Sequence, residues 1–188
     1  MKLINAETVL KTARLLLEPL QQRHAVLLFP QLQDLRIYTY IPQDPPISRE
    51  ALEQRYAMLQ SRLSPAEDEA WLNWAVRLAS SLQTDSPLVY VGCVQASVLP
   101  NGTAQLAYEF FPAFWGNGYA SEACRCVLHR LFVDYAVSAV EAEVDTRNAA
   151  SIRLLKRLGF DSVSHQAAAD FFKGSPSDED TYRLAALA

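Results

Sequence analysis

Residues 103–123 read TAQLAYEFFPAFWGNGYASEA, and most of the fold prediction follows from them. The part up to Phe111 alternates in a way that is typical of a β-strand. Two glycines separated by one residue, Gly116 and Gly118, come next, and apolar residues at helical spacing begin directly after them. A strand, a Gly-x-Gly-x-Ala loop and a helix in this order predict a backbone loop that meets the N-terminus of a helix.

A hairpin turn is predicted just before this strand. Pro100-Asn101-Gly102 is a strong turn signal, and residues 88–99 in front of it are rich in β-forming side chains. The strand over 103–111 should therefore pair antiparallel with 88–99. Its alternation gives one face with Gln105, Ala107, Glu109 and Phe111 and another with Leu106, Tyr108 and Phe110.

The rest of the chain predicts further strands and helices of ordinary length. Strands are predicted over 14–18, 74–78, 140–144, 160–163 and 181–187, and helices over 20–32, 48–61, 121–135 and 148–158. Ser48 and Asn148 are predicted N-caps, and Gly159 is a predicted C-terminal cap. Because hairpins join some strands and helices join others, the fold class is α+β and not a Rossmann alternation.

Length and composition fit one globular domain, predicted to span residues 10–188. Of the 188 residues, 50% are hydrophobic and 20% are charged, which excludes disorder, coiled coil and a small disulfide scaffold. A net charge of −4 disfavours a general nucleic-acid binder. Residues 1–10 lack the apolar core of a signal peptide, and no stretch approaches the roughly 18 apolar residues of a spanning helix. A cytoplasmic protein without membrane or nucleic-acid partners is expected.

The three cysteines do not suggest a metal site. Cys124 and Cys126 are one residue apart, Cys93 is distant, and the three histidines are scattered. This arrangement lacks the ligand spacing of a zinc site. We expect buried, reduced thiols and no bound metal.

The glycine loop favours an anionic ligand. Glycine accepts positive φ and places no side chain between backbone and ligand. The first N–H groups of the following helix have no intrahelical partner and lie at the positive end of its dipole. The pattern alone also fits a tight structural turn. A Walker loop needs a lysine that is absent here, and a dinucleotide site needs a parallel βαβ unit in place of the hairpin.

Three ordered segments resemble the GNAT superfamily of acyl-CoA-dependent N-acetyltransferases, most closely the branch that includes ribosomal-protein N-terminal acetyltransferases. Thr12-x-Arg14-Leu15-x-Leu17 is similar to the first strand of that branch, and WGNGYASEA (residues 115–123) is similar to its pyrophosphate loop. Asn148-x-x-Ser151 with Leu158-Gly159-Phe160 is similar to its second signature. The order and spacing of these segments extend the resemblance over nearly the whole chain.

The resemblance implies a mixed, splayed, mostly antiparallel sheet flanked by helices in three α/β/α layers. Acetyl-CoA would lie between the strands near 103–111 and 140–144. Backbone groups of Phe110 and Phe111 would align the pantetheine and polarise the thioester carbonyl, while Asn148 and Ser151 would lie near the thiol. The pyrophosphate would be held by the backbone of Gly116, Asn117, Gly118, Tyr119, Ala120 and Ser121. A helix cap without a cofactor role is the alternative for Asn148.

Two positions depart from the pattern of the family. Trp115 occupies the first loop position, which is often Gln or Arg in the wider superfamily, although this branch commonly tolerates the change. Leu155 stands where many members have a tyrosine that protonates the leaving thiolate. Ser151 is the nearest substitute for that acid.

Transfer to an amine requires a proton acceptor, because an alkylammonium group has a pKa near 10. Glu109 is the first candidate for this base, and a merely paired or surface carboxylate is the alternative for it. Asp145 is the second candidate, unless it pairs with Arg147. None of the histidines lies in a signature segment, and His129 is predicted to face solvent.

The predicted activity is direct transfer of an acetyl group from acetyl-CoA to a primary amine. A small-molecule amine and a protein N-terminus both stay open as the acceptor, as do a monomer and a homodimer. Because the tyrosine acid is missing, a non-catalytic acyl-CoA-binding or sensing domain on the same fold is the alternative. A phosphate-binding module unrelated to CoA is a third possibility.

Overall fold

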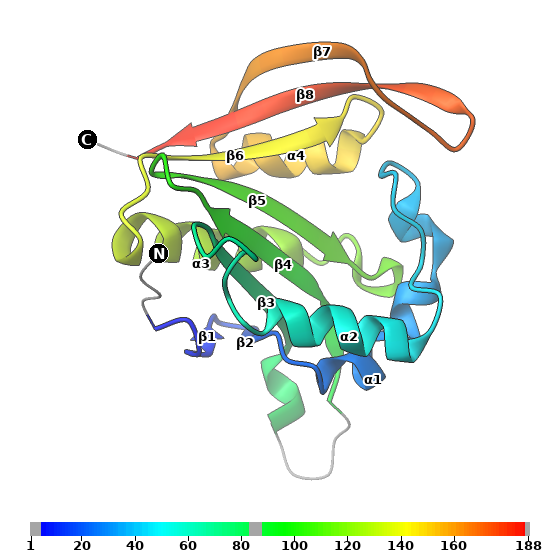
Figure 1. Ribbon diagram of the computed structural model, residues 1–188, viewed down its shortest axis with the longest axis vertical. Helices are drawn as coiled ribbons and strands as arrows, with labels where there is room; N and C mark the ends of the chain where they lie inside the picture. The colour runs from blue at the N-terminus through cyan, green and yellow to red at the C-terminus, as the bar shows by residue number, and fades with distance from the viewer. Residues whose placement is uncertain (1–4, 83–87, 187–188) are drawn as a thin grey trace.

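The computed structural model describes residues 5–82 and 88–186, which form a mixed sheet flanked by helices (Figure 1). The strands are β1 (Leu10–Lys11), β2 (Leu15–Pro19), β3 (Ala70–Leu78), β4 (Tyr90–Val98), β5 (Thr103–Phe110), β6 (Ala139–Asp145), β7 (Asp161–Phe172) and β8 (Ser175–Ala185). The helices are α1 (His24–Leu28), α2 (Arg49–Leu59), α3 (Tyr119–Asp134) and α4 (Ala149–Leu158). Short 3-10 helices cover Gln31–Gln33, Leu35–Tyr38, Ala79–Leu82 and Pro112–Phe114.

Within the described ranges the sheet has eight strands in the order β1-β2-β3-β4-β5-β6-β8-β7. Every pair of neighbours is antiparallel except β5 and β6, which are parallel and joined through α3. These two strands pair only from Thr103 opposite Ala139 to Gln105 opposite Glu141, after which their ladder ends. The predicted mixed, splayed and mostly antiparallel sheet is confirmed.

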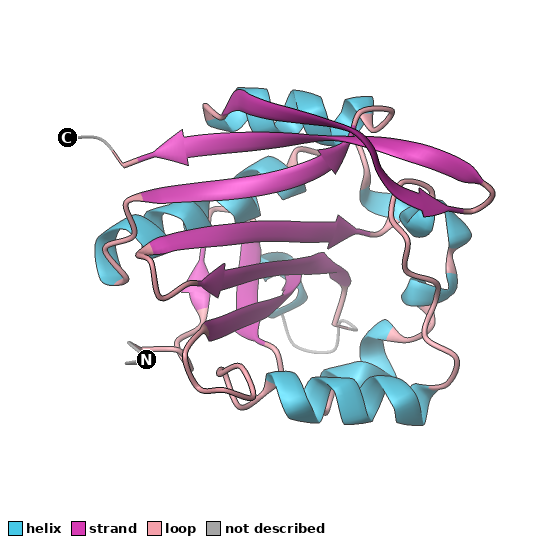
Figure 2. Ribbon diagram, turned by 45° about the horizontal axis from the view of Figure 1, so that its top comes forward, coloured by secondary structure: helices cyan, strands magenta, loops and turns pink. Residues whose placement is uncertain are grey.

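Helices cover both faces of the sheet, so the predicted three layers are confirmed. α3 and α4 lie on one face, and α1 and α2 lie on the other (Figures 1 and 2). Two adjacent residues at the end of β5 mark the division, because Phe110 belongs to the core under α3 and Phe111 to the core under α1 and α2. Both aromatic rings are buried, which fixes the position of the chain just before the glycine loop.

The structure confirms two predicted helix caps and the predicted hairpin turn. Ser48 Oγ accepts a hydrogen bond from the Ala51 N–H (3.1 Å) at the start of α2. Gly159 ends α4 with φ +95°, and the Phe160 N–H donates to the Leu155 carbonyl (3.1 Å), as in a Schellman motif. The turn at Gly102 (φ +80°) joins β4 to β5 in the expected hairpin.

Several predicted elements differ in extent from the observed ones. The helix over 20–32 is only α1, because Pro30 has no N–H for the helical ladder and its ring disfavours continuation. The short strands at 160–163 and 181–187 are instead the long hairpin of β7 and β8, turning at Lys173 and Gly174. The hairpin shows little apolar alternation, because backbone pairing holds it and most residues of β7 are exposed on both faces.

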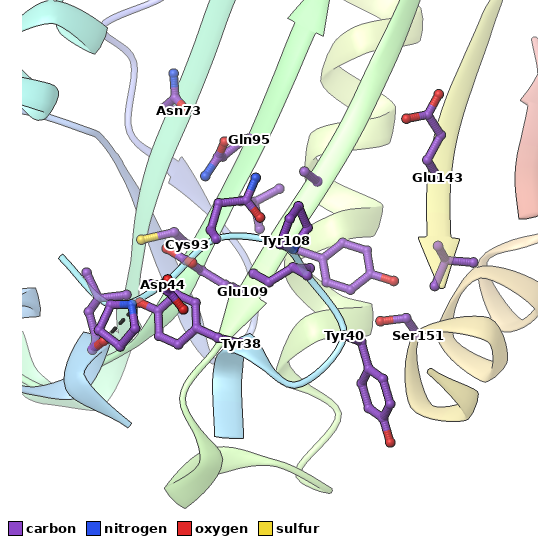
Figure 3. Close-up of a pocket in the computed structure, with 18 of the residues that line it drawn as sticks. Tyr38, Tyr40, Asp44, Asn73, Cys93, Gln95, Tyr108, Glu109, Glu143 and Ser151 are labelled. Carbon is purple, nitrogen blue, oxygen red and sulfur yellow. Dashed lines mark hydrogen bonds between the residues drawn. The ribbon is translucent and has the colours of Figure 1, made fainter. Parts of the chain in front are cut away.

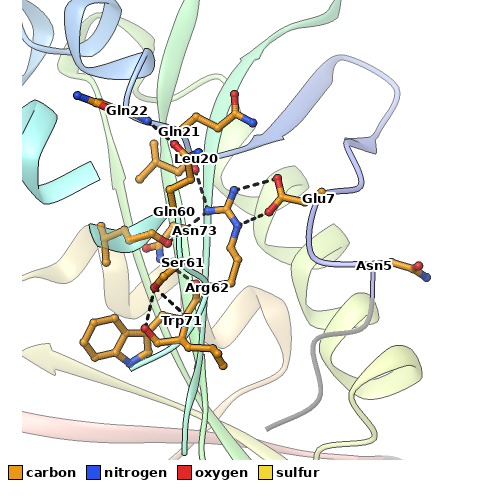
Figure 4. Close-up of polar contacts among 12 residues, drawn as sticks. Asn5, Glu7, Leu20, Gln21, Gln22, Gln60, Ser61, Arg62, Trp71 and Asn73 are labelled. Carbon is orange, nitrogen blue, oxygen red and sulfur yellow. Dashed lines mark hydrogen bonds and ion pairs between the residues drawn. The ribbon is translucent and has the colours of Figure 1, made fainter. Parts of the chain in front are cut away.

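A buried arginine joins three separate segments on the α2 side (Figure 4). Arg62 follows α2, adopts φ +64° and is 2% exposed. Its Nε pairs with Glu7 (2.8 Å), and its Nη1 donates to the Leu20 carbonyl (2.7 Å). Because removing one partner of a buried charge is costly, this contact holds α2 against β2 and the N-terminal segment.

A second buried network, around Glu18 of β2, fixes α1. Glu18 accepts hydrogen bonds from Arg77 Nε (2.6 Å) and the Tyr90 hydroxyl (2.9 Å), and it contacts His24 Nε2 (3.2 Å). His24 Nδ1 accepts from the Gln21 N–H (2.9 Å), so the ring is neutral with its proton on Nε2. Burial lowers the pKa of His24, and the hydrogen bond with Glu18 opposes this shift without cancelling it.

His24 should therefore make the stability of the fold depend on pH. A His whose pKa is lowered on folding contributes stability above its unfolded pKa, near 6.5, and this contribution is lost as the pH falls. We expect the free energy of unfolding of the wild type to decrease between about pH 7.5 and pH 5. In His24→Gln this decrease should be smaller, by on the order of 1 kcal/mol. Urea unfolding at several pH values measures the free energy of unfolding, and His129→Gln, which changes an exposed histidine, is the control. Equal pH slopes in all three proteins would contradict the assignment.

Candidate active site

The site lies where β5 and β6 part. The Phe111 N–H donates to the Val91 carbonyl (2.9 Å), so the peptide groups of Phe111 and Glu109 point toward β4. Hydrogen bonding alternates along an antiparallel strand, so the peptide groups of Tyr108 and Phe110 point the other way, toward β6. The β5–β6 ladder has already ended at Gln105. The edge of β5 at Tyr108 and Phe110 therefore faces an opening in the sheet.

A cavity of about 750 Å³ passes through this opening. Its lining includes Glu109 from β5, Ser151 and Leu155 from α4, and Tyr56 from α2, which lie on different faces of the sheet. Figure 3 shows Tyr108 and Ser151 on one side of β5 and Glu109 with Tyr38 on the other. The two predicted catalytic residues, Glu109 and Ser151, thus line one cavity from opposite faces.

The glycine loop has the backbone predicted for it. Gly116 and Gly118 have φ of +79° and +77°, and Gly118 is the N-cap of α3 without a side-chain cap. Within the described residues, no group accepts a hydrogen bond from the N–H groups of Tyr119, Ala120 or Ser121. These donors at the N-terminus of a long helix are suited to an anion.

Side chains of the loop itself hold it on the end of β5. Trp115 Nε1 donates to the Phe110 carbonyl (2.6 Å), although the residue is 51% exposed. Asn117 Nδ2 donates to the carbonyls of Phe114 (3.1 Å) and Trp115 (3.2 Å). Trp115, which departs from the family pattern, therefore links the loop to the end of β5 by a hydrogen bond.

The first signature segment reaches the same loop. Glu122, in the first turn of α3, accepts from the Arg14 backbone N–H (2.9 Å), from Arg14 Nε (2.7 Å) and from Thr12 Oγ1 (2.5 Å). Arg14 also donates to the Asn117 carbonyl (3.0 Å) and stacks over the Tyr119 ring. Burial raises the pKa of Glu122, but these hydrogen bonds outweigh burial and the pKa is lowered. An ionised Glu122 ties the start of β2 to the loop.

The start of α4 brings Asn148 and Ser151, from the second signature, to the cavity. Asn148 Oδ1 accepts from the Ser151 N–H (3.1 Å), so the predicted helix cap is confirmed. At the far end of α4, Arg157 Nη1 donates to Ser121 Oγ (3.4 Å) and adds a positive charge beside the N-terminus of α3. Leu155 is buried in the core and also lines the cavity, so its side chain has a packing role.

Glu109 has the environment of a proton acceptor. Burial raises the pKa of its carboxyl group, and the nearby charge of Arg55 opposes the rise without cancelling it. No described residue donates a hydrogen bond to the Glu109 side chain, which is only partly exposed. A carboxylate with a raised pKa and free lone pairs is better matched to a general base than one in an ion pair.

Asp145, the second candidate base, is engaged elsewhere. Its Oδ2 lies 2.5 Å from Arg147 Nη2 and accepts from Ser177 Oγ (2.7 Å). The hydrogen bonds from Arg147 are the largest cause that lowers its pKa to about 2. A carboxylate held this strongly in its ionised form is a structural anchor and a weak base.

Sequence reasoning did not connect Tyr108 with Ser151. Tyr108 lines the cavity on the same side of β5 as Ser151, and its hydroxyl is close enough to that of Ser151 for the serine to oppose the effect of burial on the Tyr108 pKa. Burial raises the pKa of the Tyr108 phenol. Strand alternation had separated Tyr108 from Glu109, but no signal in the sequence indicated that α4 would approach that face. A tyrosine from β5 is thus near the place where the family has one on α4.

Comparison with known proteins shows the family to which the chain belongs. A family model described as an acetyltransferase (GNAT) domain matches residues 14–161. The chain belongs to the GNAT acetyltransferase family. This GNAT domain is 24% identical over 176 residues to YoaA, an uncharacterized N-acetyltransferase of Bacillus subtilis, covering 94% of this chain and 96% of the relative.

Solved structures share the fold of this GNAT domain. A Salmonella typhimurium acetyltransferase that modifies the N-terminal serine of ribosomal protein L7/L12 matches with a TM-score of 0.79 at 14% identity, covering 96% of this chain and 100% of that one. A Vibrio cholerae spermidine N-acetyltransferase in complex with CoA and spermine matches with a TM-score of 0.77 at 18% identity, covering 93% and 96%. Across residues 5–82 and 88–186, no helix is both long and apolar enough to cross a membrane.

The loop geometry predicts a selective loss of donor affinity. In Gly118→Ala, a methyl group at φ +77° displaces the loop, and we expect the Kd for acetyl-CoA to rise at least tenfold, about 1.4 kcal/mol. The matched control is Gly102→Ala, with φ +80° and open space around it in the β4–β5 turn. Calorimetric titration of folded proteins measures both. An unchanged Kd in Gly118→Ala would remove the loop from the donor site.

Proposed function

We propose that this protein transfers an acetyl group from acetyl-CoA to a primary amine by direct attack of the amine on the thioester. The opening between β5 and β6 is the observation that carries the proposal. The cavity at this opening is lined by Ser151 of α4 on one face of the sheet and by Glu109 on the other. Donor and acceptor can therefore approach one point from opposite sides.

The residues on the α3 face fit acetyl-CoA. The N–H groups at the N-terminus of α3, which bond to no described residue, and the nearby Arg157 are suited to the pyrophosphate. Along the opening, the peptide groups of Tyr108 and Phe110 face away from β4 and can align the pantetheine amides. The Phe110 carbonyl already accepts from Trp115, and the Phe111 N–H already bonds Val91. Among the described groups at the end of β5, the N–H groups of Tyr108 and Phe110 are therefore the ones that can donate hydrogen bonds to acetyl-CoA. Acetyl-CoA, when bound, supplies the activated acyl group.

Glu109 would accept the proton from the incoming amine, directly or through one water. It lies on the face of β5 opposite Ser151, together with Tyr38, and its charge interacts with Arg55, Tyr38 and Tyr56. Its raised pKa brings a carboxylate closer to the range in which proton transfer is efficient near neutral pH. Asp145 does not compete for this role because it stays paired with Arg147.

Ser151 would donate a hydrogen bond to the thiolate as it leaves, with the Tyr108 hydroxyl on the same side of β5. Both hydroxyl groups line the cavity on the α4 side of β5. A thiol has a pKa near 8.5, so the thiolate leaves without full protonation. The absence of a tyrosine at position 155 is therefore compatible with turnover.

The charge of the lining favours a cationic acceptor. Besides Glu109, the lining includes Asp44, Glu143, Asp170 and Glu179, while Arg55 is the single basic residue among the described lining residues. Burial, together with repulsion from Glu143 and Asp170, raises the pKa of Glu179, so an ammonium group would relieve this repulsion. The two solved relatives act on a polyamine and on a protein N-terminus by their names. Both amine classes belong in the test.

A turnover screen decides between the enzyme and a non-catalytic acyl-CoA sensor, the second candidate that Leu155 permits. We would measure CoA release from acetyl-CoA with polyamines, aminoglycosides, amino acids and peptides that have a free N-terminus. Turnover on at least one class supports the proposal. Tight acetyl-CoA binding without turnover on any of them would favour the sensor.

Replacing Glu109 with Gln keeps its shape and removes its basicity. We expect kcat to fall by about 10²- to 10⁴-fold, the usual contribution of a general base, with the Kd for acetyl-CoA nearly unchanged. Since the pKa of Glu109 is raised, the acidic limb of the wild-type pH–rate profile should lie above the ordinary carboxyl range and should flatten in the variant. Glu53→Gln on α2 is the control. A Glu109→Gln enzyme with wild-type rate and pH profile would make Glu109 structural.

Ser151→Ala should slow turnover without abolishing it. A hydrogen bond to a charged partner contributes roughly 1–3 kcal/mol, which corresponds to about a 5- to 150-fold decrease in kcat. Exposed Ser162→Ala on β7 serves as the control. Complete inactivity of a folded Ser151→Ala protein with intact acetyl-CoA affinity would instead make Ser151 an essential acid. No change in kcat would limit Ser151 to the start of α4.

A further inference from the structure

The tip of the β7–β8 hairpin reaches a segment that lies far away in the sequence. Lys173 and Gly174 form its turn, with φ of +50° and +79°, and Lys173 projects from this turn toward residues 38–43. Its Nζ donates to the backbone carbonyls of Tyr38 (2.5 Å), Ile41 (2.6 Å) and Gln43 (3.2 Å). One ammonium group thus uses its three donors on one short piece of backbone.

The segment that Lys173 holds has few other restraints. Residues 41–47 make no backbone-to-backbone hydrogen bond with any residue in the described ranges, and three prolines interrupt them. Gln33 Nε2 donates to the Pro46 carbonyl (3.1 Å), and this contact is on the far end of the segment. Tyr38 is also held by its own hydroxyl, which donates to the Leu32 carbonyl (2.8 Å), so the position of residues 41–43 is the part that depends most on Lys173.

The hairpin tip is itself well anchored on its other side. The Arg147 guanidinium lies over the Phe172 ring and donates to Ser175 Oγ (3.1 Å), while it stays paired with Asp145. The Lys173 ammonium also lies 5.4 Å from the centre of the Phe172 ring. These contacts hold the hairpin tip, and with it the Lys173 ammonium group, in a fixed position.

Both linked segments form walls of the cavity on the Glu109 side. Tyr38 and Tyr40 line it from the first segment, and Asp170 and Phe172 line it from the hairpin. Tyr38 is buried, and its phenol lies close enough to Glu109 for the carboxylate to contribute to raising the pKa of Tyr38. Movement of this wall would change the space in which the amine meets Glu109.

We propose that Lys173 is a positioning residue for the acceptor amine, because it ties residues 38–43 to the β7–β8 hairpin and so holds the acceptor wall in its binding-competent place. The proposal rests on the proposed function and assigns a role within its acceptor half. If the wall is in place for only a fraction of the time, the apparent affinity for the acceptor falls by that fraction. In the part of the chain that the structure describes, the hydrogen bonds and ring contact of Lys173 involve residues 38–43 and Phe172, and none involves α3 or α4 of the donor half.

The test compares Lys173→Met, which keeps the stem and removes the charge, with Lys11→Met on exposed β1 as the control. The acceptor is the amine with the highest kcat/KM in the screen above. We expect the KM for this amine to rise at least fivefold in Lys173→Met, while kcat and the KM for acetyl-CoA stay within about twofold of wild type. Hydrogen–deuterium exchange should also become faster in peptides that cover residues 38–46 and unchanged in those that cover α3.

Each outcome separates this proposal from the broader one. Wild-type turnover with an unchanged acceptor KM in Lys173→Met would overturn the role of Lys173 and leave the proposed function intact. Equal losses in the KM for both substrates, or unchanged exchange over 38–46, would overturn it as well. A wild-type protein without turnover on any amine would refute the proposed function and, with it, the acceptor role of Lys173.

Discussion

The parallel pairing of β5 with β6 ends after Gln105, and the rest of the site depends on that early end. A fully paired sheet would use the peptide groups of Tyr108 and Phe110 in its ladder and would separate the two faces of the domain. Because the ladder stops, those groups face an opening, and a single cavity reaches from α4 to Glu109. The opening is stable because the large buried side chains of Phe110 and Phe111 fasten the end of β5 into both cores.

Polar contacts around the opening keep the loops in place without closing it. Glu122 joins the start of β2 to the first turn of α3, Trp115 fastens the glycine loop to the Phe110 carbonyl, and Asn148 caps α4. These contacts use side chains, so the backbone N–H groups at the start of α3 are left for a ligand. The arrangement is preorganised, which lowers the free-energy cost of ordering the site when the substrates bind.

The two carboxylates that the sequence offered as bases differ because of their neighbours. Asp145 lies beside Arg147 and Ser177, which lower its pKa to about 2 and fix it as an anchor for the β7–β8 hairpin. Glu109 lacks such partners among the described residues, and burial raises its pKa. The same residue chemistry therefore gives a structural anion at one end of β6 and a candidate base on β5.

The sequence by itself determined the local elements and the family. Alternation, the turn at Gly102, the glycine loop and the caps at Ser48, Asn148 and Gly159 act over a few residues, so their signals are present in the order of the amino acids. Contacts between distant segments were decided only by the tertiary structure. The approach of Tyr108 to Ser151, the engagement of Asp145 and the hold of Lys173 on residues 38–43 depend on how strands and helices pack. The polar β7–β8 hairpin was under-predicted for the same reason, because backbone pairing between β7 and β8, and not a buried apolar face, specifies its length.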